Sequence, residues 1–513
     1  MSQKINTIQE LFLHNAMQHG DKCAIICNGI DVSYSSLWNE SLKIKLEIQR
    51  NVLPGCGRRI AVITESKVVL LYSVIGIAQL GMNAVLISNE IPEAEIFKIV
   101  ESFNISALLI DTKINFTGDM KELKIPLLVL KRNDKETEAN KCYQQGTDGS
   151  AMTVSGGESA ITFFTSGATG VRKAVPVTHQ NIIETSKVIN NFLSMEKQIR
   201  EYISTQLTHS MGLRRAFCNF LLGGTIVLDD GIMNPAKMLL SIEKFGCNGL
   251  SGVPSIFKIL MSQNFLCQHL SKIGEKIEYI EIGSAPLYKH EKEKISVVFP
   301  NAQICMHYGS TEASRTTLLH FKKEKRMLDT VGKPAYGVKV KLTNENGEKI
   351  EQDGVGEICV KGVNVTKGYF NNDILNKQKF LDGWFRTGDI GKINSEGYLV
   401  FIGRIDDMMN IGGKKMYPQE IESDLGKKYP EFEIAISSMP HKFLGEEPVL
   451  CYPQNSRIND ECFMRMKQSL LGFFEDYKIP KRKIEVLEIP KTDNGKIIRS
   501  ELNKMLHDLH KRN

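Results

Sequence analysis

The chain has 513 residues, of which 42% are hydrophobic and 24% are charged, and its formal net charge is +6. This length exceeds what one hydrophobic core usually serves, so two or three domains are expected, and the composition excludes a disordered chain. The mild positive charge suits anionic small molecules as well as nucleic acid and does not decide between them.

The first elements along the chain are an amphipathic helix and a buried helix–strand pair. Thr7 and Glu10 form a capping box for a helix that Gly20 ends, and this start lacks the shape of a signal peptide. Residues 68–87 carry no charge, but Ser73, Gln79 and Asn83 interrupt them and Gly81 breaks them in two. They are predicted to form a buried helix and a buried strand, not a membrane span.

Short β-branched segments alternate with helical stretches through the first four hundred residues, which predicts parallel sheets with helices on their faces. After about residue 330 the pattern changes to short antiparallel strands around Asn-Gly turns. From about residue 405 a small α+β domain follows. The prediction is an α/β protein with two domains, 1–404 and 405–513. The strands that carry it are "RIAVIT" (59–64), "ALLID" (107–111), "GTIVLDD" (224–230), "YIEIG" (279–283), "KVKLTNENGEKI" (339–350), "GEICVKG" (356–362), "EIAISSM" (433–439), "PVLCYP" (448–453) and "KIEVLEIP" (483–490).

The cysteines indicate a compartment. The 11 cysteines are scattered and include no CxxC pair, which argues against a disulfide framework and favours a reducing cytoplasm. Cys23 and Cys27 lie four residues apart, but no second pair or nearby histidine completes a zinc site.

A loop rich in small polar residues follows the apolar stretch near residue 163. Its two glycines allow backbone conformations closed to other residues, so that amides can point into one concavity, and its hydroxyls and lysine add further donors. The loop therefore predicts a polyphosphate cradle, although its spacing is not that of the P-loop and a polar surface turn is equally compatible. Its residues are Thr165, Ser166, Gly167, Ala168, Thr169, Gly170 and Lys173.

Four later stretches carry groups that suit a nucleotide, although each one taken alone is more typical of an ordinary loop. In "MHYGSTEAS", an aromatic ring, a hydroxyl and a carboxylate stand together, and they suit a base, a phosphate and Mg²⁺. In "DGWFRTGDIG", a carboxylate in a tight turn suits a ribose. The residues concerned are Tyr308, Gly309, Thr311 and Glu312 in the first stretch, Asp389 in the second, Arg404, Asp406, Asp407, Gly412 and Gly413 in "GRIDDMMNIGGKKMYPQEIE", and Lys496 in "EIPKTDNGKIIRSEL".

The joint pattern of these five stretches, in this order, resembles the adenylate-forming superfamily of acyl-CoA synthetases, aryl-CoA ligases, adenylation domains and luciferases. The resemblance extends from "TIQELF" to "KIIRSEL", and further matches are "VSYSSL", "GVPSIF", "GSAPL", "VGKPAYGVKVKL" and "KGYFNN". It implies two half-reactions: a carboxylate attacks the α-phosphate of MgATP to give an acyl-adenylate, and a thiol then displaces AMP. It also implies a large N-terminal domain with a short β-barrel-like subdomain, and a small mobile C-terminal domain.

The resemblance assigns a role to each stretch. Lys496, carried by the small domain, contacts the substrate carboxylate and the α-phosphate and reduces the repulsion between these two anions. The resemblance also implies which part of MgATP each other residue contacts. Thr165 to Lys173 would bind the β- and γ-phosphates, Thr311 the α-phosphate, and Glu312 the Mg²⁺ ion. Tyr308 and Gly309, with the Gly283-Ser284-Ala285 backbone, would contact adenine, Asp389 would bind the ribose, and Arg404 would lie beside the ribose or the phosphates.

The same comparison implies rotation of the small domain between the two steps. Asp406 matches the pivot, and Gly412-Gly413 would then line the path of the thiol. This chain departs from the usual pattern at Ala168 and Arg172 in the phosphate loop. At the position of Asn410 many members of the superfamily have a lysine and others an asparagine, so the resemblance does not decide the contact with the adenylate there.

The acyl pocket is expected at "STQLTHSMGLRRAF", with His209, Met211 and Gly212. No acidic residue stands there, which disfavours an α-amino acid. If Arg214 or Arg215 faced the pocket, the substrate could carry a second carboxylate, but a surface or phosphate-side position is favoured for both.

Coenzyme A is the favoured acceptor, with Lys414 and Lys415 available for its phosphates, and a carrier protein acting in trans is the alternative. An amino-acid activator, a luciferase-like oxygenase and a non-catalytic nucleotide binder are less favoured. No nucleic-acid partner is expected, and the sequence does not indicate the oligomeric state.

Overall fold

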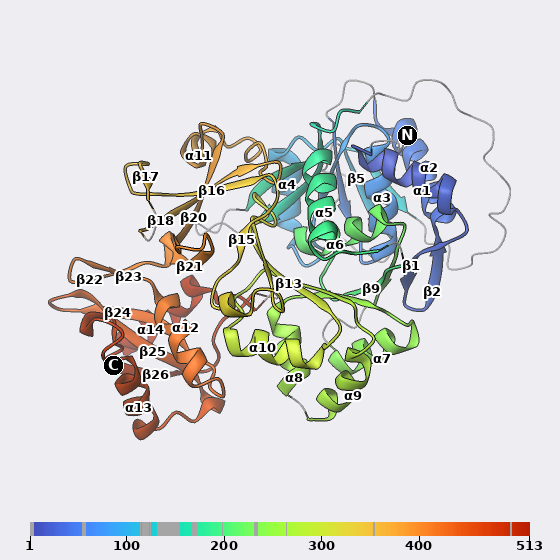
Figure 1. Cartoon of the computed structure of the whole chain (residues 1–513). Coiled ribbons are helices and arrows are strands. Elements are labelled where there is room, and N and C mark those ends of the chain that lie inside the picture. Colours follow the sequence, from blue (N-terminus) through green and yellow to red (C-terminus); the bar gives the residue numbers. More distant parts are fainter. Residues whose placement is uncertain are drawn as a thin grey trace.

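The computed structural model describes residues 5–53, 58–112, 114, 123, 125–130, 154–165, 172–196, 198–229, 234–262, 264–351, 354–492 and 495–512. Within them the chain forms four sheets: one of nine strands, two of six and one of five. Figure 1 shows the two largest layered sheets with their helices on one side of the molecule and the last sheet, in orange and red, on the other.

The nine-stranded sheet is the larger support of the functional site. Its central strands, β1, β10, β9, β11, β12 and β13, are parallel, and an antiparallel strand or pair closes each edge. In spatial order the strands are β15 (Lys333–Pro334), β14 (Thr317–His320), β13 (Gln303–Tyr308), β12 (Tyr279–Ile282), β11 (Gly249–Gly252), β9 (Arg200–Ile203), β10 (Thr225–Leu228), β1 (Cys23–Cys27) and β2 (Ile30–Ser33).

The second sheet is parallel except for its final pair, β7 and β8, which form an antiparallel hairpin. In spatial order its strands are β6 (Leu127–Leu130), β5 (Ala107–Asp111), β3 (Arg59–Ile63), β4 (Asn83–Leu86), β7 (Ser159–Thr165) and β8 (Lys173–Thr178).

Helices fill the space between these two sheets and cover their outer faces. One continuous hydrophobic core joins both sheets through α1, α2, α3, α5 and α6, whereas α4 covers the far face of the second sheet and α7 to α10 cover that of the first. Alternate residues of β3 divide between the two sides, since Ile60 and Val62 face the shared core and Ala61 and Ile63 face α4. The bounds are α1 (Ile8–His19), α2 (Tyr34–Asn51), α3 (Lys67–Ala78), α4 (Glu93–Ser102), α5 (His179–Phe192), α6 (Ser210–Leu221), α7 (Pro235–Lys244), α8 (Pro254–Ser262), α9 (Asn264–Gly274) and α10 (Lys289–Val298).

The third sheet is antiparallel and links the layered sheets to the C-terminal part. Gly347 has a φ of +82° in the predicted Asn-Gly turn between β16 and β17. No pairing among the described residues closes this sheet into a ring. Its elements are β16 (Val338–Thr343), β17 (Lys349–Ile350), β18 (Val355–Gly362), α11 (Asp373–Lys379), β19 (Phe380–Leu381), β20 (Trp384–Ile393) and β21 (Leu399–Arg404).

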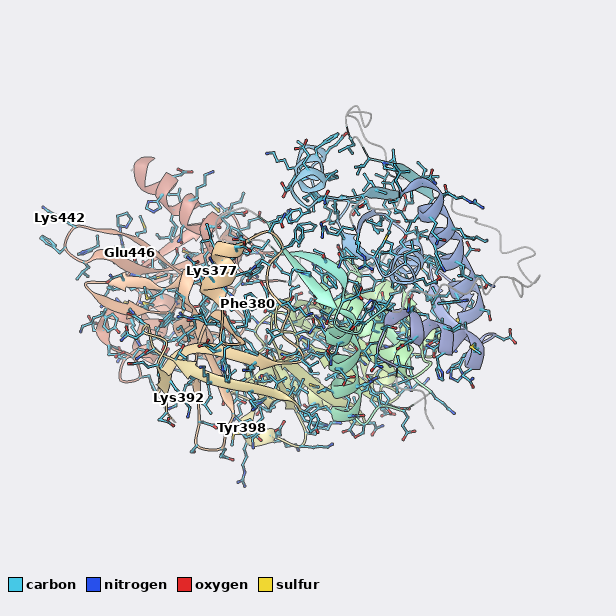
Figure 2. All side chains as sticks on the ribbon, turned by 90° about the horizontal axis from the view of Figure 1, so that it is seen from above. Lys377, Phe380, Lys392, Tyr398, Lys442 and Glu446 are labelled. Carbon is cyan, nitrogen blue, oxygen red and sulfur yellow. The ribbon has the colours of Figure 1, made fainter. Side chains whose placement is uncertain are left out.

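The C-terminal part is an α+β unit, with α12 and α13 packed on one face of its sheet and α14 on the other. The turn between β24 and β25, with Lys442, lies at the outer edge of the molecule (Figure 2). The elements are β22 (Met409–Ile411), β23 (Lys414–Met416), α12 (Pro418–Lys428), β24 (Ala435–His441), β25 (Gly445–Pro453), α13 (Asp460–Leu470), β26 (Arg482–Val486) and α14 (Arg499–Arg512).

The local predictions for the first hundred residues are confirmed. Thr7 caps α1 through a complete capping box with Glu10, and residues 68–87 form most of the buried helix α3 and the strand β4, with Gly81 at φ +61° between them. No helix in the described ranges is both long and apolar enough to cross a membrane.

The C-terminal part contacts the layered sheets through specific groups. The Tyr288 hydroxyl donates to the carbonyl of Glu422 at 3.3 Å, and Lys427 forms an ion pair with Asp329 at 2.9 Å. A Cβ added to Gly426 of α12 would lie 2.6 Å from the Tyr288 ring, so the absence of a side chain there permits this close approach. The predicted boundary between residues 404 and 405 stays a prediction.

Candidate active site

The candidate site lies at the carboxyl edge of the nine-stranded sheet. Three predicted stretches leave that edge: the turn before α6 follows β9, Gly283 to Ala285 follow β12, and Gly309 to Glu312 follow β13. Ligands of parallel α/β sheets bind at this edge because consecutive loops converge there.

Tyr308, Asp389 and Arg404 form one hydrogen-bonded group. The Tyr308 hydroxyl donates to Asp389 Oδ2 at 2.6 Å, and Arg404 Nη1 lies 2.8 Å from Asp389 Oδ1. Burial raises the pKa of the Asp389 carboxyl, while Arg404 and the Tyr308 hydroxyl favour its ionised form. Adjacent strands β20 and β21 place Asp389 and Arg404 directly opposite one another. Three residues predicted for the nucleoside are therefore fixed in one place.

Lys496 lies within electrostatic range of this group. The positive charge of Lys496 favours the ionised form of Asp389 and so acts to lower its pKa. Burial and, after it, Arg404 lower the pKa of Lys496, although part of its side chain is exposed to solvent. The turn that carries it has Gly495 at φ +79°, where an added Cβ would lie 3.3 Å from Ser255 Cβ at the start of α8. Hence a residue of the C-terminal part lies near a group of side chains supplied by the nine-stranded sheet and the third sheet.

The phosphate-loop prediction falls mostly outside the described residues, which omit Ser166, Gly167, Ala168, Thr169 and Gly170. The residues that bound the loop are Thr165 and Lys173, which pair with one another across the β7–β8 hairpin. The departure at Arg172 has a structural consequence, because its Nε donates to Glu95 Oε1 at 2.6 Å and ties the end of the loop to α4.

Tyr369 links Lys173 to Glu312 and was not among the predicted site residues. Lys173 Nζ lies 5.6 Å from the centroid of the Tyr369 ring, and the Tyr369 hydroxyl donates to Glu312 Oε1 at 2.9 Å. The amide of Thr366 also donates to the carbonyl of Glu312 at 2.8 Å. The sequence signal was the segment "KGYFNN", which matched the superfamily without suggesting a chemical role.

Close backbone packing shapes the loops after β12 and β13. An added Cβ at Gly283 would lie 2.2 Å from the His307 ring, and one at Gly309 would lie 2.6 Å from the carbonyl oxygen of Ala313. Ser284 adopts a φ of +76°, which is unusual for a residue with a side chain, and its hydroxyl contacts Met211 Sδ at 3.2 Å. The backbone of Gly283 to Ala285 thus lies between the predicted adenine side and the predicted acyl side.

The predicted acyl residues are at the start of α6. His209 is its N-cap residue and Met211 is half-buried, whereas Gly212 is buried and an added Cβ would lie 2.3 Å from the carbonyl oxygen of Gln206. Of these three residues, Met211 contacts the loop after β12, through the Ser284 hydroxyl.

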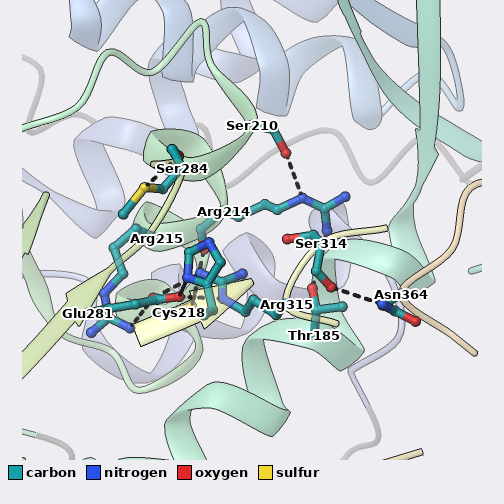
Figure 3. A network of polar contacts seen from close by, with 12 residues as sticks. Thr185, Ser210, Arg214, Arg215, Cys218, Glu281, Ser284, Ser314, Arg315 and Asn364 are labelled. Carbon is teal, nitrogen blue, oxygen red and sulfur yellow. Dashed lines mark hydrogen bonds and ion pairs between the residues drawn. The ribbon is translucent and has the colours of Figure 1, made fainter. Parts of the chain in front are cut away.

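The surface position favoured for Arg214 and Arg215 was wrong, since both side chains are 1% exposed. Arg215 forms ion pairs with Glu201 at 2.5 Å and Glu281 at 3.1 Å. Arg315 and His307 also contact Glu281. Burial alone would raise the pKa of Glu281, but its cationic neighbours hold it well below the usual value. Figure 3 shows this network together with Ser284. His307, which contacts Glu281, precedes Tyr308 in β13, so the network adjoins the strand that carries Tyr308.

The predicted pivot and glycine pair lie in the segment after β21. Arg404 Nη2 is 3.7 Å from Asp406 Oδ2, and Gln419 of α12 donates to Asp407 Oδ2 at 2.6 Å. Gly412 and Gly413, with φ of +60° and +85°, form the turn of the β22–β23 hairpin, and the amide of Gly413 donates to Asn410 Oδ1 at 2.9 Å. Next to that turn, Lys415 pairs with Glu345 on the β16–β17 turn, and Lys414 lies over the Tyr477 ring.

Residues 12–370 match the family model described as AMP-binding enzyme. The chain belongs to the AMP-binding enzyme family.

The curated relatives of this AMP-binding enzyme are CoA ligases. It is 27% identical to the 2-succinylbenzoate–CoA ligase of Bacillus subtilis, over 94% of this chain and 95% of that protein. It is 31% identical to the oxalate–CoA ligase of Saccharomyces cerevisiae, but that match covers 66% of this chain and only 62% of the yeast protein. These names confirm, at the level of the family, the prediction of an acyl- or aryl-CoA ligase.

Solved structures confirm the fold class, with a large N-terminal domain and a C-terminal domain. The o-succinylbenzoate CoA synthetase of Bacillus subtilis, in complex with the acyl-adenylate intermediate, superimposes with a TM-score of 0.81 at 24% identity, covering 96% of this chain and 97% of that one. ATP-bound MatB from Rhodopseudomonas palustris gives 0.83 at 23% identity, covering 98% and 99%.

The residues present fit the predicted magnesium ion. Glu312 is buried, its Oε1 accepts from Tyr369, and its Oε2 has no hydrogen-bond donor among the described residues. One carboxylate together with substrate phosphates is the usual protein environment of Mg²⁺, which retains water for its other positions. Glu312 would hold the ion, and the ion would neutralise phosphate charge.

Proposed function

We propose that this protein activates a carboxylic acid with ATP, as an acyl-adenylate, and transfers the acyl group to coenzyme A. The observation that carries the proposal is that Lys496, next to Gly495, which packs on Ser255, lies within electrostatic range of Asp389 and Arg404. A ribose held by Asp389 puts the α-phosphate of the same nucleotide within the region that Lys496 reaches.

The first half-reaction brings the substrate carboxylate to the α-phosphate, and both groups are anionic. Lys496 and Thr311 supply a positive charge and a hydroxyl donor where the negative charge accumulates, which lowers the barrier most effectively in a site that is already organised. Asp389, Arg404 and Tyr308 hold the nucleoside, so the α-phosphorus faces the acid in a fixed orientation. Lys173 and the loop after Thr165 hold the terminal phosphates that leave as pyrophosphate.

The second half-reaction needs the side of the acyl carbon that Lys496 occupies. Rotation about Asp406 would remove Lys496 and bring the Gly412-Gly413 turn to the site, where residues without side chains leave room for the pantetheine arm. CoA is proposed as the acceptor because the curated relatives are named CoA ligases. A reducing cytoplasmic compartment is also proposed, supported by the free thiols of the eight cysteines whose side chains the structure describes.

The experiment is ATP–pyrophosphate exchange with a panel of carboxylic acids, followed by CoA addition and detection of the acyl-CoA. Lys496→Ala should reduce exchange by about 100-fold or more, the usual effect of removing one group that stabilises the transition state. The same variant should retain CoA transfer when it receives a synthetic acyl-adenylate. Lys491→Ala, which removes the exposed partner of Glu433 on the same segment, is the matched control. Full exchange by Lys496→Ala would overturn the proposal, and acylation of a carrier protein in place of CoA would correct the acceptor.

A further inference from the structure

Three arginines in one region are almost completely buried: Arg214, Arg215 and Arg315. Two buried carboxylates face them. Glu201 binds Arg215, and Glu281 lies between Arg215 and Arg315. Three guanidinium groups against two carboxylates leave one positive charge in excess, apart from any proton on His307.

The excess charge is on Arg214. Its Nε donates to Ser210 Oγ at 3.0 Å, and its Nη1 donates to the carbonyl of Asn181 and to Thr185 Oγ1, both at 3.2 Å. These partners are neutral, and Nη2 has no acceptor among the described residues. Burial and, after it, the neighbouring cation Arg315 lower the pKa of Arg214 to about 9, and no carboxylate contributes. A buried cation without an anion is costly, and proteins normally pair such a group.

The surroundings of Arg214 place it at the acyl side of the site. Ser210, to which it donates, directly follows His209, and Met211 of the same turn contacts Ser284. On the other side, Thr185 lines a small cavity of about 10 Å³ together with Asn364, and Asn364 donates to the carbonyl of Ser314 at 3.1 Å. Figure 3 shows the Arg214 guanidinium directed away from Arg215 and Glu281, toward Thr185 and Ser314.

Ser314 belongs to the loop that carries Thr311 and Glu312. Arg214 therefore lies between the start of α6 and the loop that is proposed to face the α-phosphate and Mg²⁺. A substrate whose reacting carboxylate meets Lys496 would extend its other end toward α6.

We propose that Arg214 binds a second carboxylate at the far end of the acid substrate, so that this enzyme activates dicarboxylic acids. The inference rests on the proposed function, because it names the substrate class of the same site. A guanidinium presents two parallel N–H groups that match a carboxylate, and the free Nη2 of Arg214 retains donors for it. Arg215 cannot take this role, since its fork is occupied by Glu201.

The test compares each dicarboxylic acid with its half-amide, which has nearly the same shape but lacks the second charge. Succinate with succinamate, glutarate with glutaramate, and phthalate with phthalamate are the probes in ATP–pyrophosphate exchange. For the best pair, the wild-type enzyme should favour the diacid by about 100-fold in kcat/KM, the usual consequence of leaving one partner of a buried charge pair unmatched. In Arg214→Met this ratio should fall to about 1, and Arg214→Lys, with a charge but no fork, should lie between.

Binding without chemistry gives a second measurement. The preferred diacid should raise the melting temperature of the wild-type protein in the absence of ATP, and should leave that of Arg214→Met unchanged. Equal activation of diacids and half-amides by the wild type, or an unchanged ratio in a folded Arg214→Met protein, would overturn the inference and leave the proposed function intact. If no acid supports exchange, the proposed function fails, and the melting shift still decides whether Arg214 binds the second carboxylate.

Discussion

The Tyr369 hydroxyl donates a 2.9 Å hydrogen bond to Glu312 Oε1, while the ring of the same tyrosine faces Lys173. One side chain thus connects the proposed magnesium ligand to the lysine at the end of the phosphate loop. Burial first, and then the Glu312 carboxylate, raise the pKa of the Tyr369 hydroxyl, so it remains a donor at any working pH. The remaining oxygen of Glu312 is directed by this bond and stays open to a cation.

Tyr369→Phe removes the donor and keeps the ring. Glu312 should then be less well oriented, and the Mg²⁺ concentration for half-maximal exchange should rise by about 10-fold or more, as is usual when the group orienting a metal ligand is lost. Tyr369→Leu should weaken ATP binding as well, since Lys173 loses the aromatic face. The measurement is the exchange rate as a function of free Mg²⁺ at saturating ATP. An unchanged Mg²⁺ dependence in Tyr369→Phe would place the metal elsewhere.

Lys496 should give adenylate formation an alkaline limit. Its pKa is lowered from 10.5 by the surrounding protein and by Arg404. The reaction needs the ammonium form, so kcat/KM for ATP, which reports ionisations of the free enzyme, should fall as pH rises through a pKa below 10.5. Bound polyphosphate favours the charged form, so in kcat the fall should appear at higher pH. Lys496→Arg keeps its charge throughout and should lose this limb, whatever its absolute rate. An identical alkaline limb in the arginine variant would assign the titration to another group.

The buried network around Glu281 should be a large contributor to stability. Arg215→Met leaves Glu201 without its ion-pair partner and Glu281 with one arginine fewer, and breaking a buried ion pair from one side costs about 3–5 kcal/mol. Urea unfolding at neutral pH measures this loss. Arg214→Met is the matched comparison from the next position of the same helix: it removes a buried cation with neutral partners and should cost far less. Equal destabilisation by the two variants would contradict the claim that the ion pairs of Arg215 stabilise the fold more than the neutral hydrogen bonds of Arg214.

Short-range signals in the sequence predicted much of this fold. The capping box of Thr7 and Glu10, the Asn-Gly turn at Gly347 and the interrupted apolar segment around Gly81 each act over a few residues, and each is found as expected. The resemblance to the adenylate-forming superfamily also implied that Lys496 reaches the nucleotide site, and this stays a prediction because it depends on how the C-terminal part docks.

The network could not be predicted because its members are far apart in the chain. Glu201 and Glu281 lie within short strands whose neighbours are mostly apolar, 14 and 66 residues from Arg215. Adjacent positions on a helix point about 100° apart, so Arg214 and Arg215 meet different neighbours, and periodicity alone does not identify them. Tyr369 was missed for a related reason, since its partner Glu312 is 57 residues away.

Acid should destabilise the protein through His179, which joins α5 to the start of α1. His179 Nδ1 accepts a hydrogen bond from the amide of Ile8 at 3.2 Å, the residue is 1% exposed, and burial lowers its pKa from 6.5 to about 4. Between these values the unfolded chain binds more protons than the folded one, so stability is present above pH 6.5 and is lost as pH falls through about 4. A difference of this size amounts to about 3 kcal/mol. His320, whose pKa burial also lowers to about 4, should add a similar loss.

His179→Asn keeps an acceptor for the amide of Ile8 but does not titrate. Urea unfolding of this variant should show, between pH 7 and pH 4.5, about half of the loss in unfolding free energy that the wild type shows. An unaltered pH dependence in this variant would mean that the pKa of His179 does not differ between the folded and the unfolded protein.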